Sequence, residues 1–361
     1  MNIVVFAGGV GTRLWPLSRK KSPKQFEKVV GDKSTLQLAV DRLLPSFPPE
    51  NLYIASNEQY RDMIHAQLPM VDKSHIIGEP QMRDVGPAVG LATAILVREA
   101  PNTPMAILWS DHLVRNVDLF NTVLKTAERI IESEPNKIVF IAQKPRFASQ
   151  NLGWIKFGAK VKSEGDIHFH TFDGFKYRPD SQTAIDFFES GHYAWNLGYF
   201  VTTPTFIWEK YKQFAPDMYE KLSKIQSAWK TPEWERILAE VYPTLEKISF
   251  DNVILEKLSH DEAYVVSEDL RWSDIGAWEA LKEALQDSEE HNVTQGNVMV
   301  RDSKDSLVYN YNNGQLLITI DVEGMLVINT HDVTLVCRKE SVPKIKTLVE
   351  SLSGTENEHL T

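Results

Sequence analysis

Short apolar runs and amphipathic segments alternate along the first 142 residues of the chain. The apolar runs have the length and composition of buried strands: Ile3–Phe6, Leu52–Ala55, His75–Ile77, Met105–Trp109 and Ile138–Ala142. Apolar residues at helical spacing mark the segments between them: Thr35–Leu44, Glu58–Leu68, Pro87–Glu99 and Leu119–Glu132. Ser34 and Asp118 stand where N-caps belong. The alternation predicts an α/β fold, with a Rossmann-like, mostly parallel mixed sheet and helices on both faces.

A glycine-rich loop follows the first apolar run. Three glycines lie within four positions, at Gly8, Gly9 and Gly11, and Arg13 lies two residues after the last of them. Glycine N–H groups can approach a phosphate without a Cβ in the way, and a forked guanidinium can bind phosphate oxygens. An ordinary glycine-rich turn after a first strand explains the composition about as well. The dinucleotide fingerprint is excluded because its third glycine is missing, and the P-loop because Gly-Lys-Ser/Thr is absent.

A longer stretch is more specific than the glycines alone. Ala7-Gly-Gly-Val-Gly-Thr-Arg-Leu-Trp-Pro-Leu-Ser-Arg19, followed by Pro-Lys24-Gln-Phe, resembles the signature of the sugar-1-phosphate nucleotidyltransferases. The Trp-Pro-Leu-Ser-Arg and Pro-Lys-Gln-Phe variants are similar to the mannose-1-phosphate guanylyltransferase branch. The resemblance covers nearly the whole chain. It implies a nucleotide-diphospho-sugar transferase fold and transfer of GMP from GTP to α-D-mannose 1-phosphate, giving GDP-mannose and pyrophosphate.

The resemblance also implies roles for the residues of this stretch. Arg13 and Lys24 are implied to be catalytic, because they offset charge on the phosphates. The implied nucleotide-binding residues of the loop are Ala7, Gly8, Gly9, Gly11, Thr12 and Arg13.

Charge and composition exclude several classes of protein. The net charge of −10 argues against a nucleic-acid partner. Residues 13–28 are nevertheless basic, and this suits a small anionic ligand, with a solvated basic loop as the alternative. The cations of this stretch are Arg13, Arg19, Lys20, Lys21, Lys24 and Lys28. No apolar run approaches the roughly 20 residues of a membrane helix, the N-terminus opens on a strand without a leader pattern, and Cys337 is the single cysteine. We therefore expect a cytoplasmic protein without a membrane partner.

Nucleotidyl transfer needs cations and a metal on the phosphates but no side-chain nucleophile, because the sugar phosphate itself attacks. Asp111 follows the predicted strand Met105–Leu108, and Asp274 comes after the predicted strand Ala263–Val266. Two such aspartates together could hold one Mg²⁺ through their hard oxygen ligands. Taken singly, an aspartate at either position is more commonly a helix N-cap.

The sequences around both aspartates strengthen the metal interpretation. They resemble the family motifs Pro-Ser-Asp-His and Trp-Ser-Asp-Val-Gly-Ser-Trp, whose aspartates ligate the metal. Ser110, in the first motif, is implied to bind the nucleotide, and Trp109 replaces the family's proline.

The segment Glu79-Pro-Gln-Met-Arg-Asp-Val-Gly-Pro87-Ala resembles the family's Glu-Pro-x-x-Arg-Asn-Thr-Ala-Pro-Ala, which surrounds the guanine base. The Glu79 carboxylate could accept from N1–H and the 2-amino group of guanine, and Pro87 is implied to bind the nucleotide as well. An exposed loop acid is the alternative for Glu79. Asp84, Val85 and Gly86 depart from the family's Asn-Thr-Ala.

Three further segments resemble the sugar side of the family site. Gly153 lies in Gly-Trp-Ile, similar to Gly-Tyr-Ile, and Asn196 lies in Trp-Asn-Leu-Gly-Tyr-Phe, similar to Trp-Asn-Ser-Gly-x-Phe. Tyr177 and Arg178 replace the Glu-Lys of Phe-x-Glu-Lys-Pro. Arg178 can still bind the sugar phosphate, but Tyr177 cannot accept two hydroxyls as a carboxylate does. The identity of the sugar 1-phosphate therefore stays open.

The pattern of predicted strands and helices changes beyond residue 291. Short β runs stand at Asn297–Arg301, Leu307–Tyr309, Gln315–Ile320, Met325–Asn329 and Val333–Arg338, before a helical pattern at Val342–Leu352. We predict a catalytic domain over 1–290 and a small β-helix-like domain with a terminal helix over 291–361. In the family a short left-handed β-helix often occupies this place and helps to pair subunits, which implies a homodimer.

Two rival functions remain. The first is the same chemistry on another sugar 1-phosphate, and the second is a non-catalytic nucleotide-sugar sensor. The joint presence of the predicted catalytic residues speaks against the sensor; they are Arg13, Lys24, Asp111 and Asp274.

Overall fold

The computed structural model describes residues 1–9, 11–19 and 22–361; Lys20, Lys21 and the side chain of Thr12 lie outside this description. The chain divides into two compact units. The first comprises Met1–Ala7, Asp41–Trp109 and Arg115–Arg271, and the second comprises Gly8–Val40, Ser110–Val114 and Trp272–Thr361. The second unit thus holds the glycine loop and both predicted metal ligands. Among the described residues, every helix is too short or too polar to cross a membrane.

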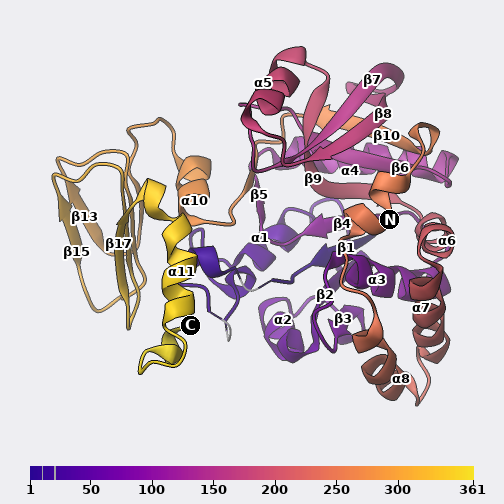
Figure 1. Ribbon diagram of the computed structural model, residues 1–361, viewed down its shortest axis with the longest axis horizontal. Helices are drawn as coiled ribbons and strands as arrows, with labels where there is room; N and C mark the ends of the chain where they lie inside the picture. Colours follow the sequence, from indigo (N-terminus) through magenta and orange to yellow (C-terminus); the bar gives the residue numbers. More distant parts are fainter. Residues whose placement is uncertain (10, 20–21) are drawn as a thin grey trace. The chain divides into compact units, whose positions relative to one another are not determined.

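A nine-stranded mixed sheet is the frame of the first unit, in the order β3-β2-β1-β4-β9-β6-β10-β8-β7 (Figure 1). The pairs within β3-β2-β1-β4 are parallel, as is β6 with β10, whereas β9 is antiparallel to β4 and β6. The strands are β1 (Asn2–Phe6), β2 (Leu52–Asn57), β3 (Ile76–Glu79), β4 (Met105–Trp109), β6 (Ile138–Gln143), β7 (Gly153–Glu164), β8 (Ile167–Tyr177), β9 (Tyr193–Thr202) and β10 (Ala263–Glu268). The predicted α/β class is confirmed.

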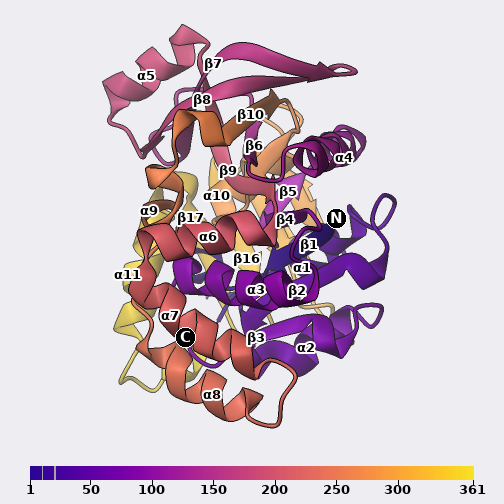
Figure 2. The ribbon, with the colours of Figure 1, turned by 90° about the vertical axis from the view of Figure 1, so that its right-hand side faces the viewer.

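Helices cover this sheet and bury its apolar side chains. α3 packs against α6 and α7, and the three run together in Figure 2. Val4 and Ile107 of the sheet and Leu91 and Ile95 of α3 share one buried core. The helices of this unit are α2 (Arg61–Gln67), α3 (Val85–Glu99), α4 (Val117–Ser133), α5 (Ser181–Ser190), α6 (Pro204–Phe214), α7 (Pro216–Ala228), α8 (Trp234–Val241) and α9 (Phe250–Val253).

One predicted helix start needs correction. The side chain of Asn116, not that of Asp118, accepts from the Leu119 N–H at the start of α4. Asn116 competes successfully because an amide oxygen caps a helix as well as a carboxylate does. The other predicted cap is confirmed, since the Ser34 hydroxyl accepts from the Gln37 N–H at α1 (Thr35–Asp41).

The C-terminal part of the second unit is built from parallel β coils. β12, β14 and β16 pair in parallel along one sheet, and β13 and β15 pair in parallel along another, while β17 closes the first sheet antiparallel to β16. These strands are β12 (Val293–Gln295), β13 (Val298–Arg301), β14 (Leu307–Asn310), β15 (Leu317–Ile320), β16 (Met325–Asn329) and β17 (Thr334–Arg338). The C-terminal β unit is therefore confirmed, although the sequence did not indicate β12.

The glycine loop and its continuation pack on the same core as the β coils. Trp15 lies in one buried cluster with Trp278 of α10 (Trp278–Leu285) and Leu326 of β16. The Trp278 indole N–H donates to the Trp15 carbonyl at 2.9 Å, and the Trp15 indole N–H donates to the Leu360 carbonyl at 2.8 Å, beyond α11 (Pro343–Ser351). These contacts fix the backbone that carries the predicted phosphate-binding residues.

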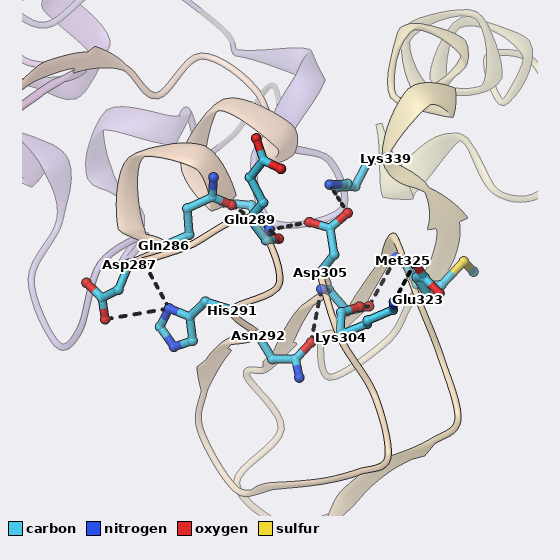
Figure 3. Close-up of polar contacts among 12 residues, drawn as sticks. Gln286, Asp287, Glu289, His291, Asn292, Lys304, Asp305, Glu323, Met325 and Lys339 are labelled. Atoms are coloured by element: carbon cyan, nitrogen blue, oxygen red, sulfur yellow. Dashed lines mark hydrogen bonds and ion pairs between the residues drawn. The ribbon is translucent and has the colours of Figure 1, made fainter.

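Asp305 ties α10 to the β coils (Figure 3). Its carboxylate oxygens accept from the ammonium groups of Lys282 and Lys339, and Lys282 is only 2% exposed. The Lys282 ammonium also donates to the Glu289 carbonyl at 3.1 Å. Partial burial would raise the pKa of Asp305, but the bonds from the two lysines hold it below the ordinary value. The ionised carboxylate is therefore part of what holds this unit together.

Candidate functional site

The two predicted metal-binding aspartates lie beside one short strand pair of the second unit. β5 (His112–Val114) and β11 (Trp272–Asp274) are antiparallel, and Asp274 stands opposite His112. Asp111 leads directly into β5, and α10 starts after Ala277, so neither aspartate caps a helix in the described chain. The N-cap alternative is thus wrong for both. Asp274 also belongs to its own strand rather than to the end of Ala263–Val266, because β10 and β11 are separate.

Lys24 is held against Asp111. The Lys24 ammonium lies 2.7 Å from Asp111 Oδ2, and Lys24 is 7% exposed although it is charged. Burial would raise the pKa of Asp111, but the charge and the hydrogen bond of the Lys24 ammonium outweigh that effect and hold the pKa well below the ordinary range. Asp111 is therefore an ionised carboxylate at neutral pH.

Asp111, His112 and Asp274 can each direct one ligand atom to a common point. The three atoms lie within 4.8 Å of one another, and His112 Nε2 is 3.8 Å from Asp111 Oδ1. Ligands that sit about 2.1 Å from Mg²⁺ in an octahedron are about 3 to 4 Å apart. The donor set therefore fits a small divalent cation.

Two glycines of the site make room for charged side chains. A Cβ on Gly11, whose φ is +66°, would lie 2.6 Å from Lys24 Cγ. A Cβ on Gly276 would lie 2.9 Å from Asp274 Oδ1 and 3.1 Å from Arg13 Nη2. Arg13 and Asp274 thus flank the same glycine, so the loop cation and the second aspartate are neighbours.

The first two glycines of the loop have a different surrounding. A Cβ on Gly8 or Gly9 would meet nothing within 4 Å, and both glycines are exposed. Open backbone of this kind lets a ligand approach the N–H groups closely. Ala7, which precedes the loop, and Ser110, which precedes Asp111, are also predicted to bind the nucleotide, and both are buried.

The basic stretch after the loop divides into two roles. Arg19 forms a bidentate ion pair with Asp332, at 2.7 and 2.6 Å, and this pair lowers the pKa of Asp332 to about 2. Arg13, in contrast, is exposed. Within the described residues, Arg19 is therefore held in an ion pair, whereas the Arg13 side chain lies beside Gly276 and Asp274.

Glu79, the predicted base-recognition residue of the first unit, is buried at the end of β3. The Tyr242 hydroxyl donates to Glu79 Oε2 at 2.5 Å. Burial raises the pKa of Glu79 to about 7, although the bond from Tyr242 acts in the opposite direction. The alternative of an exposed loop acid is wrong. Pro87, the other residue predicted from this segment, is buried in the first turn of α3.

The predicted sugar-side residues share one row of the first unit's sheet. Gly153 of β7 stands between Tyr177 of β8 and Asn196 of β9. Tyr177 is 58% exposed, and the Arg178 guanidinium lies 5.0 Å from its ring centre. Arg178, directly after β8, has a φ of 44°, in the left-handed region that few side chains adopt. The structure therefore brings these four residues together, as expected from three separate segments.

No sequence motif predicted two of the contacts that hold the site residues in place. The Tyr242 bond to Glu79 spans 163 residues and follows no motif. Trp109, in the family's proline position, packs on Phe6 with ring centres 5.1 Å apart and donates from its indole N–H to the Gly198 carbonyl at 3.2 Å. Its indole nitrogen would be 2.4 Å from a Cβ on Gly198, so a glycine is required there.

Comparison with known proteins shows the family of the chain. The nucleotidyl transferase family model matches residues 2–291, and the MannoseP isomerase/GMP-like beta-helix domain model matches residues 296–352. The chain belongs to the nucleotidyl transferase family. This nucleotidyl transferase is 32% identical to a mannose-1-phosphate guanylyltransferase of Salmonella muenchen, over 99% of this chain and 74% of that protein. It is 31% identical to a mannose-1-phosphate guanylyltransferase of Escherichia coli K12, over 97% of this chain and 73% of that protein.

A solved structure extends the likeness to the whole fold. The crystal structure of a Thermus thermophilus protein, described as a mannose-1-phosphate geranyltransferase, matches this nucleotidyl transferase with a TM-score of 0.85 and 28% identity. The match covers 98% of this chain and 99% of that one. The family resemblance of residues 7–26 is thereby confirmed.

Proposed function

We propose that this nucleotidyl transferase is a mannose-1-phosphate guanylyltransferase, which converts GTP and α-mannose 1-phosphate into GDP-mannose and pyrophosphate. The observation that carries the proposal is the convergence of Lys24, Asp111, Asp274 and Arg13 around Gly11 and Gly276. The guanylyltransferase relatives, which match nearly the whole chain, support the choice of substrates.

The proposed reaction is one in-line displacement at phosphorus. An oxygen of the sugar phosphate attacks the α-phosphorus of GTP, the bond from the α-phosphorus to the α–β bridging oxygen breaks, and pyrophosphate leaves with that electron pair. Negative charge spreads over the phosphate oxygens during transfer, so fixed positive charge nearby lowers the barrier. Arg13 supplies forked donors to these oxygens from its exposed position beside Gly276, and the open N–H groups of Gly8 and Gly9 supply further donors.

Asp111 and Asp274 are proposed to hold Mg²⁺, for which their carboxylates are suitable ligands. The bound cation would neutralise phosphate charge and align the reacting phosphates. Lys24 keeps Asp111 ionised and fixes one of its oxygens. The sensor alternative is disfavoured because a protein that only binds a nucleotide sugar has no need of this cationic and anionic set.

The sugar phosphate is proposed to bind along the row of Gly153, Tyr177, Arg178 and Asn196. Arg178 supplies charge to the phosphate, and the Asn196 amide can donate to and accept from sugar hydroxyls. Tyr177 leaves the row without the carboxylate of the family motif. For this reason the same transfer to another sugar 1-phosphate is the second candidate.

We also propose that two copies pair through the C-terminal β coils. Met299, Leu316, Ile318 and Ile320 are 42%, 50%, 49% and 64% exposed, and Met299 stands opposite Ile318 in the β13–β15 pair. Exposed apolar rows of this kind mark association surfaces. Ile318→Glu with Ile320→Glu should give a monomer in analytical ultracentrifugation where the unchanged protein sediments as a dimer; equal sedimentation of both would refute this assignment.

Pyrophosphate release across a matrix of nucleotides and sugar phosphates tests the proposal. GTP with mannose 1-phosphate should give the highest kcat/KM, and excess EDTA should abolish turnover. Higher activity with another sugar 1-phosphate would establish the second candidate. Tight binding of GDP-mannose without turnover on any pair would establish the sensor.

A further inference from the structure

His112 stands at the proposed cation site but has no part in the chemistry described so far. It follows Asp111 in the chain, and it is the register partner of Asp274 across the β5–β11 pair. The backbone of His112 is therefore fixed by its peptide bond to Asp111 and by its pairing with Asp274. The His112 side chain is 12% exposed, and its ring lies 5.0 Å from the Trp272 ring in an edge-on arrangement. The imidazole is thus held in place against the strand pair.

The two oxygens of Asp111 face different partners. Oδ2 is paired with the Lys24 ammonium at 2.7 Å, and Oδ1 lies 3.8 Å from His112 Nε2. Lys24 therefore occupies one oxygen and leaves the other directed toward the imidazole. A cation ligated by Oδ1 would not have to displace Lys24.

We propose that His112 is a third protein ligand of the divalent cation, through Nε2, beside Asp111 and Asp274. The ligand atoms of the three residues already lie within 4.8 Å of one another. The spacing of 3.8 Å between Nε2 and Oδ1 falls within the roughly 3 to 4 Å expected for two ligands of one octahedral ion. This inference rests on the proposed cation site but concerns a different residue and a different property.

The consequence is a preference among cations. Mg²⁺ favours oxygen ligands and retains its waters, whereas imidazole nitrogen suits the first-row transition metals. A site with two carboxylates and one imidazole should therefore bind Mn²⁺ more tightly than Mg²⁺. Replacement of the imidazole by an amide should remove much of that preference, while both aspartates continue to bind either ion.

The test uses Mn²⁺ itself as the probe, on the full chain, with and without a non-hydrolysable GTP analogue. Bound Mn²⁺ is counted by electron paramagnetic resonance, and ¹⁴N modulation of its echo reports a directly bonded nitrogen. The variants are His112→Asn, Asp274→Asn and, as a matched control, His331→Asn. His331 also adjoins an aspartate, with Nε2 3.4 Å from Asp332 Oδ2, but its side chain is 82% exposed and far from the site in sequence.

The unchanged protein and His331→Asn should show one Mn²⁺ with ¹⁴N modulation. His112→Asn should lose the modulation and weaken Mn²⁺ binding by at least about tenfold, with a much smaller effect on Mg²⁺ measured by competition. Asp274→Asn should weaken both ions. Circular dichroism spectra establish that each variant is folded.

Retention of the ¹⁴N modulation and of the Mn²⁺-to-Mg²⁺ affinity ratio in His112→Asn would overturn the assignment. Absence of Mn²⁺ binding from the unchanged protein, with and without the analogue, would overturn it as well. Neither result depends on turnover, so GTP-dependent pyrophosphate release, measured in parallel, shows separately whether the transferase assignment holds.

Discussion

At the scale of single residues, the proposed site depends on charged side chains placed beside glycines. The absence of a Cβ at Gly11 leaves room for the Lys24 side chain, and its absence at Gly276 leaves room for Asp274 and Arg13. The sequence motifs predicted these residues as a set, because their spacing follows the family pattern. The motifs did not predict how they pair, and in particular they did not show that Lys24 binds Asp111.

Asp111→Asn and Asp274→Asn should each reduce kcat by on the order of 10²-fold or more, since each removes a fixed charge that supports the reacting phosphates. Steady-state pyrophosphate release measures the effect, and Asp287→Asn serves as the control because its side chain, just beyond the end of α10, is 79% exposed. Near-native turnover in either site variant would show that the aspartate is not needed for the chemistry.

Gly276→Ala should lower kcat strongly while the fold survives. The added Cβ would lie 2.9 Å from Asp274 Oδ1 and 3.1 Å from Arg13 Nη2, so one of the two charged groups must move. A displacement of about 1 Å can cost on the order of 10²-fold in rate. Gly314→Ala is the matched control, because its nearest atom, Asn312 Oδ1, is 3.4 Å away. Equal rates in the two variants would show that the Asp274–Arg13 spacing is unimportant.

At the scale of elements, the sheet unites residues that the sequence could only place on separate segments. The register of β7, β8 and β9 puts Gly153, Tyr177 and Asn196 in one row. Local patterns gave strands such as Met105–Trp109 and Met325–Asn329 with their observed bounds. They did not indicate β12, because its one apolar residue, Val293, is followed by the polar Thr294 and Gln295 and no apolar run marks the strand.

Long-range pairs mark the limit of sequence-based prediction in this chain. Tyr242 reaches Glu79 across 163 residues, and neither residue lies in a pattern that points to the other. The burial of Glu79 follows from this packing, so a carboxylate that reads as a loop acid has a pKa near neutrality instead. Only tertiary structure supplies such information.

The sugar-side row predicts a selective effect on one substrate. Arg178→Ala should raise the KM for the sugar phosphate by about tenfold or more and leave the KM for GTP nearly unchanged, because a charge-assisted bond contributes about 1.5–3 kcal/mol. Arg236→Ala is the control, since its side chain is 61% exposed on α8. Equal increases in both KM values would place Arg178 away from the sugar phosphate.

The link between α10 and the β coils predicts a pH-dependent stability. Asp305→Asn should destabilise the protein by on the order of 2 kcal/mol, because it leaves the buried Lys282 ammonium without its carboxylate partner. The folded pKa of Asp305 lies below the ordinary value of 3.8, so the ionised form stabilises the fold above that pH and the contribution is lost as the pH falls through the folded pKa.

The difference in Tm between the unchanged protein and Asp305→Asn should therefore be largest near neutrality and shrink below about pH 4. Asp321→Asn is a matched control, since Asp305 and Asp321 both have a positive φ, 52° and 56°, but Asp321 is exposed. A difference in Tm that stays constant down to about pH 3, below the ordinary carboxyl pKa, would contradict the role of the charge.

At the scale of the whole molecule, the two compact units do not follow the order of the chain. The second unit takes the glycine loop and the turn with Asp111 together with the C-terminal β coils. The sequence predicted a division near residue 290 because local texture changes there, and the two family models also meet near that point. The local sequence pattern indicates local structure only. Which segments form one compact unit depends on the distant residues that share a core, as Trp15 and Trp278 do here.

A protein that joins a guanine nucleotide to mannose 1-phosphate must also catalyse the reverse reaction, and GDP-mannose tests both substrates at once because it carries both groups. When the protein is incubated with GDP-mannose, pyrophosphate and Mg²⁺, it should form GTP and mannose 1-phosphate in equal amounts. ³¹P nuclear magnetic resonance measures both products. ADP-mannose and GDP-glucose should react much more slowly under the same conditions. An unchanged GDP-mannose spectrum, or equal rates with all three nucleotide sugars, would contradict the account.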